Sequence, residues 1–400
     1  MGSEEKMTVD ERYKYLRVLH RRYENASREE RGRLLDEAAA ITGLERKYLC
    51  HLLNQEGPIR KERERQRSVV YDGEVRGAVR LVADALDWIC PERLQPTLAK
   101  TALHLAGFGE LVVSEGLLAK LEEISITSVY RLCKDLRKGE PRLPQRRGRA
   151  QGDGVSAEIP MTRLAWDISE PGHFELDLVH HCGRSAHDDY LCTMQWIDVA
   201  TGWSERVAVY GRSAREMKVA FNKVLSRCPF PILEIHPDNG SEFMNRPLLE
   251  FFGQKVTGVK LTRSRPYHKN DNRFVEQKNH TLVRAYLGNE RLDTRTQCAL
   301  LNRIYDDMWV YYNLFQPVLR QVDKQCERSP EGQLILHRRH DVARTPFERL
   351  RATLCLSEQA LDDLQAIYEV NNPRALKRSI QEQLNVLLAT CTPLSGKEDA

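Results

Sequence analysis

The 400-residue sequence has no apolar run long enough to span a bilayer, which argues against an integral membrane protein. Its first residues, MGSEEKMTVDERYKYL, lack the apolar core of a secretory signal, so we expect a cytoplasmic protein with no membrane partner. No two of the 10 cysteines lie closer than ten positions apart, and no CxxC pair occurs. Neither a zinc site nor a redox pair is therefore indicated.

The residues that are present indicate a modular globular chain. Hydrophobic residues make up 41% and charged residues 30%, with a mean hydropathy of −0.54, which allows buried cores to form. At roughly 100 to 200 residues per domain, the length indicates two to four domains. The net charge is only +4, so local clusters of basic residues are more informative than the total.

Residues 1–57 have the pattern of three helices, at 10–24, 28–42 and 45–54. Ser27 and Glu30 form a capping-box pattern, and Gly43 suits a tight turn. Core spacing is expected for Tyr48, Leu49, Leu52 and Leu53. The segment resembles a helix-turn-helix whose last helix presents Arg46, Lys47 and His51 to a DNA groove. The alternative is a plain helical dimerisation module.

A basic linker is predicted at 58–72, where residues 58–67 contain five basic and two acidic side chains, Arg60 and Lys61 among the basic ones. Such a run is either a solvated helix face or a segment that follows the DNA backbone.

A second helical set is predicted at 73–138, with helices at 74–87, 92–106, 114–123 and 127–138. The break at 125–127 again resembles a helix-turn-helix, with Arg131, Lys134 and Arg137 near the exposed side. Two such modules would read two segments of a DNA element, and each correct base contact adds about 1–3 kcal/mol of discrimination.

Residues 139–165 form a predicted linker rich in Pro and Gly, which separates the helical part from the rest of the chain. Residues 131–149 carry eight basic and two acidic side chains, and Arg146 and Arg147 are candidate phosphate contacts.

Beyond residue 165 the pattern becomes strand-like. Expected strands and helices follow in the order strand 173–180, strand 190–198, strand 204–210, helix 213–227, strand 232–236, helix 246–253, strand 258–262 and a long helix from about 270. This order resembles that of the RNase H-like fold, which implies an α/β core at 166–320 with a five-stranded mixed sheet and flanking helices. The fold class is thus multidomain: all-α helix-turn-helix modules, this core, and a helical tail at 321–400.

Three carboxylates stand out in the core segment. Asp177 lies mid-strand among apolar neighbours, where a charge is costly unless it is paired or metal-bound. Asp238 follows a strand in the motif Asp-Asn-Gly-Ser-Glu-Phe, and Glu276 lies in a helical stretch after 37 intervening residues. This arrangement resembles the DDE catalytic core of bacterial insertion-sequence transposases and retroviral integrases, as does Thr-Arg-Ser-Arg-Pro-Tyr-His-Lys-Asn-Asp at 262–271.

The resemblance implies a transposase that binds transposon ends, hydrolyses phosphodiester bonds there and transfers the 3′-OH strand into target DNA. It implies two Mg²⁺ ions, with Mn²⁺ as a substitute, held by Asp177, Asp238 and Glu276. The expected partners are double-stranded DNA, both transposon ends and target, and further copies of the chain in a homo-oligomer; an accessory ATPase is left open. The alternatives are a metal-dependent DNA nuclease of the same fold and a transposase-derived regulator without catalysis.

Other residues are expected to support this site. Asn239 and Gly240 would shape the loop at Asp238; the candidates for holding substrate are Lys269, Lys278, Asn279, Arg263 and Arg265. Each carboxylate also has a structural alternative. Asp177 would pair with a buried Arg or Lys side chain, Asp238 would be a turn former, and Glu276 would be an exposed helix residue.

Several attractive residues are not assigned to the site. His180, His181 and Cys182 point to alternating faces of a strand and would not form one compact metal site. Asp188 and Asp189 are interpreted as turn residues, and Asp198 as a cap or turn residue. The tail suits either oligomer contacts or target-DNA binding.

Overall fold

A computed structural model describes residues 7–55, 70–138, 143, 168–183, 185, 187–237, 258–262, 275, 278–328 and 334–391. The chain divides into two compact units, Met1–Val70 and Tyr71–Ala400. Across the described residues, no helix is both long and apolar enough to cross a membrane.

The N-terminal unit contains three helices: α1 (Val9–Glu24), α2 (Arg28–Thr42) and α3 (Arg46–Leu53). All three lie where the sequence predicts them. Thr8 and Ser27 cap the first two helices with their side-chain oxygens, and Gly43 ends α2 with a left-handed φ of 67°. The buried core of the unit consists of Leu16, Leu19, Tyr23, Leu34, Leu35, Ala38, Leu49, Leu52 and Leu53.

One residue of α3 was assigned wrongly to this core. Tyr48 is 45% exposed, because the three leucines of α3 fill its contact with the other helices. Arg46 and Lys47 are exposed beside it, and Arg46 also forms an ion pair with Asp36 of α2. The outer face of α3 is therefore both basic and aromatic.

The unit Tyr71–Ala400 begins with a second helical set. Its elements are α4 (Gly73–Ala85), α5 (Pro91–Leu94), η1 (Gln95–Thr97), α6 (Leu98–Gly107), α7 (Glu115–Glu123) and α8 (Ile126–Leu136). The predicted helices are present, but the one at 92–106 is divided by the 3₁₀ turn η1. Pro96 accounts for the division, since it has no amide hydrogen to donate within a helix.

This helical set packs against elements from the end of the chain, an arrangement that the sequence did not predict. Lys377, on α16 (Pro373–Ala389), is 6% exposed, and its Nζ lies 2.9 Å from Asp84 Oδ1 of α4. Arg374 Nε lies 2.8 Å from Asp84 Oδ2. The hydroxyl of Tyr311 donates to the carbonyl of Ala85 at 2.9 Å. Residues 73–138 and the sheet therefore share one unit.

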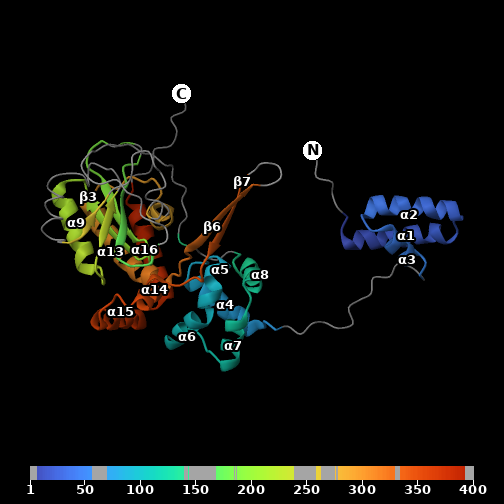
Figure 1. Cartoon of the computed structure of the whole chain (residues 1–400), viewed down its shortest axis with the longest axis horizontal. Helices are drawn as coiled ribbons and strands as arrows, with labels where there is room; N and C mark the ends of the chain where they lie inside the picture. The colour runs from blue at the N-terminus through green and yellow to red at the C-terminus, as the bar shows by residue number, and fades with distance from the viewer. Residues whose placement is uncertain are drawn as a thin grey trace. The chain divides into compact units, whose positions relative to one another are not determined.

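The central feature of this unit is a five-stranded mixed sheet, as the sequence predicts (Figure 1). Its strands are β1 (His173–His180), β2 (Leu191–Asp198), β3 (Ser204–Tyr210), β4 (Glu234–Pro237) and β5 (Lys260–Leu261). They lie in the order β3-β2-β1-β4-β5. The first three form an antiparallel meander, whereas β4 pairs in parallel with both β1 and β5.

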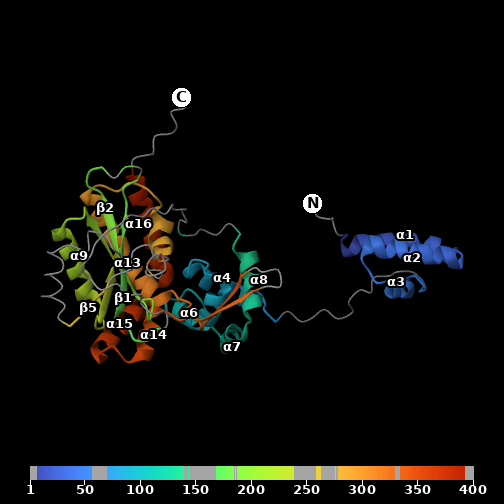
Figure 2. The ribbon, with the colours of Figure 1, turned by 45° about the horizontal axis from the view of Figure 1, so that its top comes forward.

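Helices cover both faces of the sheet. Alternate side chains of β1, including Leu176 and Leu178, share an apolar cluster with α9 (Ala214–Arg227). On the other face, Val179 belongs to a cluster with α16, α13 (Arg295–Val310), the π-helical segment η2 (Asn279–Arg284) and α12 (Ala285–Leu287). Figure 2 shows α9 on one side of the strands and α16 on the other. Because side chains alternate along a strand, Asp177 faces the layer of α13 and η2.

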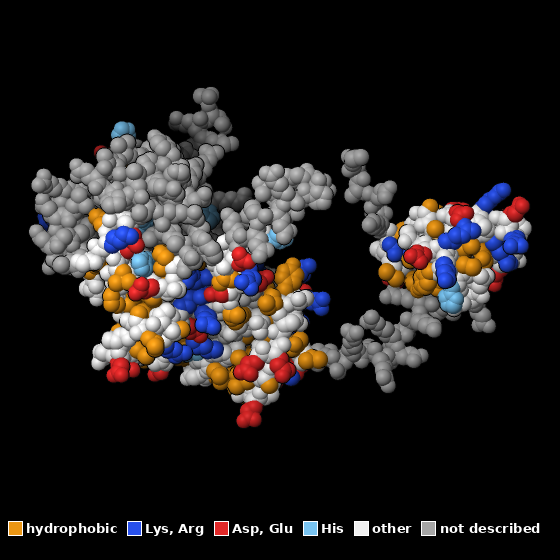
Figure 3. Space-filling view, in the orientation of Figure 1, with side chains coloured by type: hydrophobic (Ala, Val, Ile, Leu, Met, Phe, Trp, Pro, Cys, Tyr) orange, Lys and Arg blue, Asp and Glu red, His pale blue; other side chains and the backbone are white. Residues whose placement is uncertain are grey.

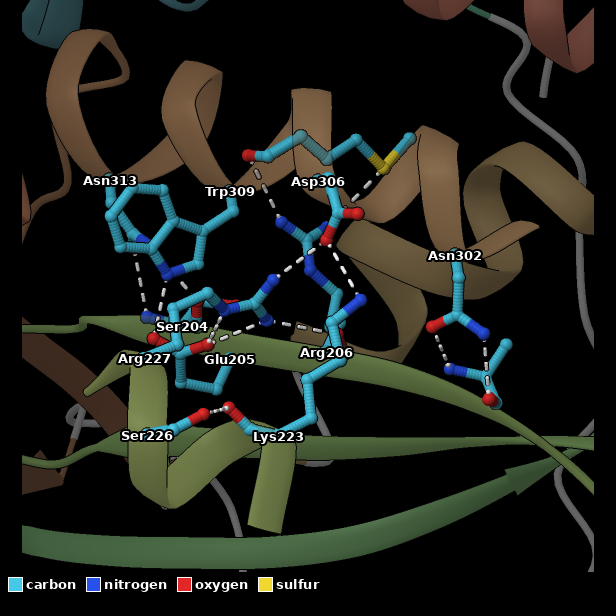
Figure 4. Close-up of polar contacts among 12 residues, drawn as sticks. Ser204, Glu205, Arg206, Lys223, Ser226, Arg227, Asn302, Asp306, Trp309 and Asn313 are labelled. Atoms are coloured by element: carbon cyan, nitrogen blue, oxygen red, sulfur yellow. Dashed lines mark hydrogen bonds and ion pairs between the residues drawn. The ribbon is translucent and has the colours of Figure 1, made fainter. Parts of the chain in front are cut away.

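Side chains cover the outer edge of β3, which is an edge strand of the sheet. Asn313, in the π-helical segment η3 (Tyr311–Phe315), accepts from Ser204 N at 2.9 Å and donates to Ser204 O at 3.0 Å. Asn302 forms the same pair of bonds with Ala208, at 3.1 and 2.9 Å (Figure 4). These amides occupy backbone groups that another strand would otherwise pair with.

The tail is not entirely helical, so the prediction for its first part is wrong. β6 (Gln321–Arg328) and β7 (Leu334–His340) form an antiparallel hairpin. Helices α14 (Pro346–Thr353), α15 (Glu358–Val370) and α16 follow it. The sequence Ser-Pro-Glu-Gly at 329–332 was an overlooked signal, since Pro and Gly favour turns and disfavour a continuous helix.

Candidate active site

Asp177 lies in the middle of β1 and is held by amide donors. Its Oδ1 accepts from Leu178 N at 2.8 Å, and its Oδ2 accepts from the side-chain amide of Asn279. Asn279 is 8% exposed and begins η2. Wide π-helical turns occur frequently at functional sites. The structure thus brings together two of the residues that the sequence assigns to the active site.

A second contact ties the same helical stretch to β1. Val275 N donates to Glu175 Oε2 at 2.9 Å. Glu175 and Asp177 share a face because they are two positions apart on a strand, and Val275 and Asn279 lie four positions apart. Val275 and Asn279 therefore both lie beside β1. Glu175, only 1% exposed, was missed by the sequence analysis, although its spacing of two from Asp177 was visible.

Lys278 directly precedes Asn279 and lies in a basic environment. Burial, with smaller contributions from the charges of Arg93 and Arg206, lowers the pKa of Lys278 to about 7. A nearby phosphate would favour the charged form of this amine.

A buried polar network fixes β4 and β5 beside β1. Glu234, 4% exposed, contacts His173 Nδ1 at 2.9 Å and accepts from Thr262 Oγ1 at 2.7 Å. Thr262 Oγ1 also lies 2.8 Å from His236 Nδ1. Burial opposes ionisation of Glu234, but the donors His173, Thr262 and Lys260 outweigh it and lower its pKa to about 2. The network therefore holds the end of β4 in a defined position.

The remaining predicted site residues lie outside the described residues. In the core segment they are Asp238, Asn239, Gly240, Arg263, Arg265, Lys269 and Glu276, and in the linkers Arg60, Lys61, Arg146 and Arg147. The predicted helix at 246–253 also lies outside them. Among the residues that are described, no three His, Cys, Asp or Glu side chains gather as a metal-binding group.

The residues that the sequence set aside have structural roles. His180 Nδ1 lies 3.1 Å from the Tyr190 hydroxyl, whereas His181 Nε2 lies 2.7 Å from Thr193 Oγ1, so the two do not form one site. Asp188 is exposed in the β1–β2 loop with φ 60°. The turn role of Asp198 is confirmed, since its buried carboxylate accepts bonds from Gly172 and Thr201.

We expect His181 to make the fold sensitive to acid. Burial, with smaller contributions from Arg284 and His180, lowers the pKa of His181 to about 3, whereas an unfolded histidine has a pKa near 6.5. Because the unfolded chain takes up this proton first, the free energy of unfolding should fall as pH drops below about 6.5, by up to ~1.4 kcal/mol per pH unit.

Denaturant midpoints from about pH 7 to about pH 5 measure this effect. His181→Gln, whose amide retains a bond to Thr193, should show a shallower slope. Equal slopes in the two proteins would assign the acid sensitivity to another group.

The candidate DNA-contact residues of α8 lie on its surface. Arg131, Lys134 and Arg137 are exposed, as is Tyr130 at 56%.

The N-terminal unit also has a mixed surface. Figure 3 shows Lys and Arg side chains interspersed with hydrophobic ones on the visible surface of the N-terminal unit. Basic and aromatic side chains together suit contacts to phosphates and bases.

Comparison with known proteins assigns the chain to a family. It is 34% identical over 338 residues to Uncharacterized protein y4rM of Sinorhizobium fredii (strain NBRC 101917 / NGR234), which covers 84% of this chain and 94% of that protein. The chain therefore belongs to the family of y4rM. No protein-family model matches it.

Solved structures of retroviral integrase catalytic cores also show similarity. The HTLV-2 integrase catalytic core domain in complex with magnesium is 20% identical, with 37% of this chain and 90% of that chain covered and a TM-score of 0.27. The BIV integrase catalytic core domain is 16% identical, with 46% and 96% covered and a TM-score of 0.28. Scores this low do not establish a shared fold, so the function proposed below depends on the geometry of this chain.

Proposed function

We propose that this protein is a DNA transposase of the DDE type, with Asp177, Asp238 and Glu276 as its catalytic carboxylates. The proposal is carried by the hydrogen bond from Asn279 to Asp177. That contact joins the middle of β1 to the helical stretch in which the sequence places Glu276. Asp177 is partly exposed in mid-strand and accepts bonds from two amide donors, which makes it a suitable site residue at such a junction.

The strand register supports the inclusion of Asp238. β1 and β4 are parallel, and the last described pair is Leu176 with Pro237. The next position along β1 is Asp177, and the residue after Pro237 in the chain is Asp238. If the register continues by one residue, the two carboxylates become neighbours.

Helical spacing supports the inclusion of Glu276. Val275 and Lys278 are helical, and Asn279 contacts Asp177 directly. Residues three apart on a helix lie on neighbouring parts of its surface. Glu276 precedes Asn279 by three positions, so we expect its carboxylate to face the same strand.

These three side chains fit Mg²⁺, which prefers carboxylate oxygens. When bound, two such ions would stabilise charge on the phosphate and lower the pKa of an attacking water. Asn279 fixes the orientation of Asp177, while Lys278 offers a cation to a DNA phosphate. We propose supporting roles for Lys269, Arg263 and Arg265 as substrate contacts, and for Asn239 and Gly240 in shaping the loop at Asp238.

DNA recognition is proposed for the two helical modules. The exposed faces of α3 and α8 carry Arg46, Lys47, Arg131, Lys134 and Arg137. The linkers with Arg60, Lys61, Arg146 and Arg147 would follow the phosphate backbone. We propose a homo-oligomer, because two transposon ends have to be processed and joined together.

A strand-joining assay tests the proposed function. The full chain is incubated with Mg²⁺, a labelled duplex that carries the end of its own element, and a target plasmid. Labelled DNA joined to the plasmid is the expected product. Cleavage without joining would identify a nuclease of the same fold. Binding of the end with neither cleavage nor joining would identify a regulator, and both results contradict the proposal.

Arg131→Ala is expected to weaken binding of the transposon end. Loss of one phosphate contact should reduce the slope of log K against the logarithm of salt concentration by about one. Loss of a base contact should instead cost about 1–3 kcal/mol of binding free energy at one base pair. Titrations at several salt concentrations measure both effects. Arg215→Ala, which removes an exposed arginine on α9, is the control and should bind normally. Unchanged binding by Arg131→Ala would remove α8 from the DNA interface.

A further inference from the structure

Gln195 occupies the position on β2 next to Asp177. The sheet register pairs Gln195 with Asp177 on β1 and with Arg206 on β3. Directly paired residues project from the same face, with Cβ atoms roughly 5 Å apart. The three side chains therefore form a row across the sheet, under the layer of α13 and η2.

The middle of this row is buried and has unused hydrogen-bonding capacity. Gln195 is 0% exposed, and within the described part of the chain neither its Nε2 nor its Oε1 has a hydrogen-bond partner. Nε of Arg206, a residue that is 1% exposed, likewise has none there. An unsatisfied buried polar group costs about 1–3 kcal/mol. An apolar side chain would suit this place better unless the amide serves a purpose.

The other contacts of Arg206 hold its guanidinium in place without neutralising it. Nη2 of Arg206 donates to Met308 O at 3.3 Å, and the guanidinium carbon lies 5.0 Å from the centre of the Tyr312 ring. Figure 4 shows Arg206 between β3 and the helix above it. The neighbouring Arg227 forms the ion pairs with Glu205 and Asp306, and among the described residues no acidic side chain forms one with Arg206.

The unused atoms of the row are complementary in order. Arg206 Nε is a donor, and Oε1 of the paired Gln195 is an acceptor. The other end of the same amide, Nε2, is a donor, and the carboxylate of the paired Asp177 is an acceptor. Because directly paired residues have Cβ atoms roughly 5 Å apart, a change of side-chain torsion or a single bridging water would connect these atoms.

We propose that Gln195 and Arg206 are positioning residues for Asp177, joined to it in a hydrogen-bonded row from β3 through β2 to β1. Gln195 donates to the carboxylate from the sheet while Asn279 donates from η2, so the carboxylate is oriented from two directions. The buried charge of Arg206 polarises the connecting amide and favours the anionic carboxylate. This inference deepens the proposed function and rests on Asp177 as a metal ligand.

Binding of Mn²⁺ to the full chain, followed by isothermal titration or by the electron paramagnetic resonance of the free ion, tests the row. Gln195→Met removes both polar atoms with little change in shape and should weaken Mn²⁺ binding about tenfold, as loss of a residue that orients a metal ligand typically does. The unfolding midpoint without metal should stay the same or rise, since a buried polar group is removed.

Thr193→Val is the matched control. Thr193 is also 0% exposed on the same face of β2, but it pairs with Val179 and contacts His181 and Tyr305. The substitution should lower stability while leaving Mn²⁺ affinity unchanged. Equal losses of affinity in Thr193→Val and Gln195→Met would show a general packing effect and overturn the positioning role.

Two further variants separate the possible failures. Asp177→Asn should remove the Mn²⁺ site. If Mn²⁺ binding is the same with and without the Asp177 carboxylate, the proposed function fails. If Asp177→Asn loses the site but Gln195→Met binds like the wild type, only the row is refuted. Should Gln195→Met not fold, Arg206→Lys keeps the charge but lacks Nε, and it should weaken Mn²⁺ binding severalfold; unchanged affinity would refute the row.

Discussion

Asp177→Asn is expected to reduce joining of transposon ends to target DNA by roughly a thousandfold. A metal-held carboxylate contributes several kcal/mol of charge stabilisation in the transition state, and each 1.36 kcal/mol corresponds to a factor of ten. The substitution retains one oxygen to accept from Asn279, so the fold should persist. The measurement is the initial rate of joined product with Mg²⁺, together with the affinity for the end duplex, which should change little.

Asp188→Asn is the matched control for this experiment. Asp188 lies in the loop that follows the same strand, is exposed, and has a φ of 60° that asparagine also tolerates. Joining should remain at the wild-type rate in this variant. A wild-type rate in Asp177→Asn would exclude Asp177 from the site. Asp238→Asn and Glu276→Gln are expected to behave as Asp177→Asn does.

Asp84→Ala is expected to destabilise the unit Tyr71–Ala400 by roughly 3 kcal/mol, because removing the nearer partner leaves a buried charge only partly compensated. The charge belongs to Lys377, whose side chain is 8% exposed and which would retain Asp87 at 3.5 Å. Denaturant unfolding measures the loss. In an Asp84→Ala background, Lys377→Met should restore much of the stability, since an apolar side chain then fills the buried position.

An exposed ion pair is the control for this effect. Lys223 and Asp306, with side chains 36% and 52% exposed, lie 3.0 Å apart, so Lys223→Met should cost less than about 1 kcal/mol. A similar loss of unfolding free energy in Lys223→Met and in Asp84→Ala would show that burial does not increase the contribution of the Asp84–Lys377 ion pair.

The Asp84 contacts also predict an acid dependence of stability. Burial opposes ionisation of Asp84, but hydrogen bonds from Arg374 and Lys377 outweigh it and lower the pKa. A carboxylate with a lowered folded-state pKa stabilises the fold above its unfolded value of about 3.9. This contribution should disappear as pH falls below that value, and it should be missing from Asp84→Ala.

Local patterns allowed much of the fold to be predicted. The capping side chains Thr8 and Ser27 and the turn at Gly43 mark helix ends within a few residues of sequence. Alternation of apolar residues likewise predicted the meander and Asp177 within its first strand. The errors arose where two local interpretations competed. Tyr48 fits a core spacing as well as an exposed face, and the segment 321–340 contains polar residues compatible with either a helix or a hairpin.

The sequence by itself determined the local elements and the residue types of the candidate site, because caps, turns and periodicity depend on neighbours along the chain. Only the tertiary structure decided which distant residues meet. Asn279 reaches Asp177 across 102 positions, and Lys377 reaches Asp84 across 293. Gln195 acquires its place beside Asp177 through strand register alone. Strand register and packing depend on the total apolar surface buried over whole faces of the sheet. That total cannot be obtained from any short stretch of sequence.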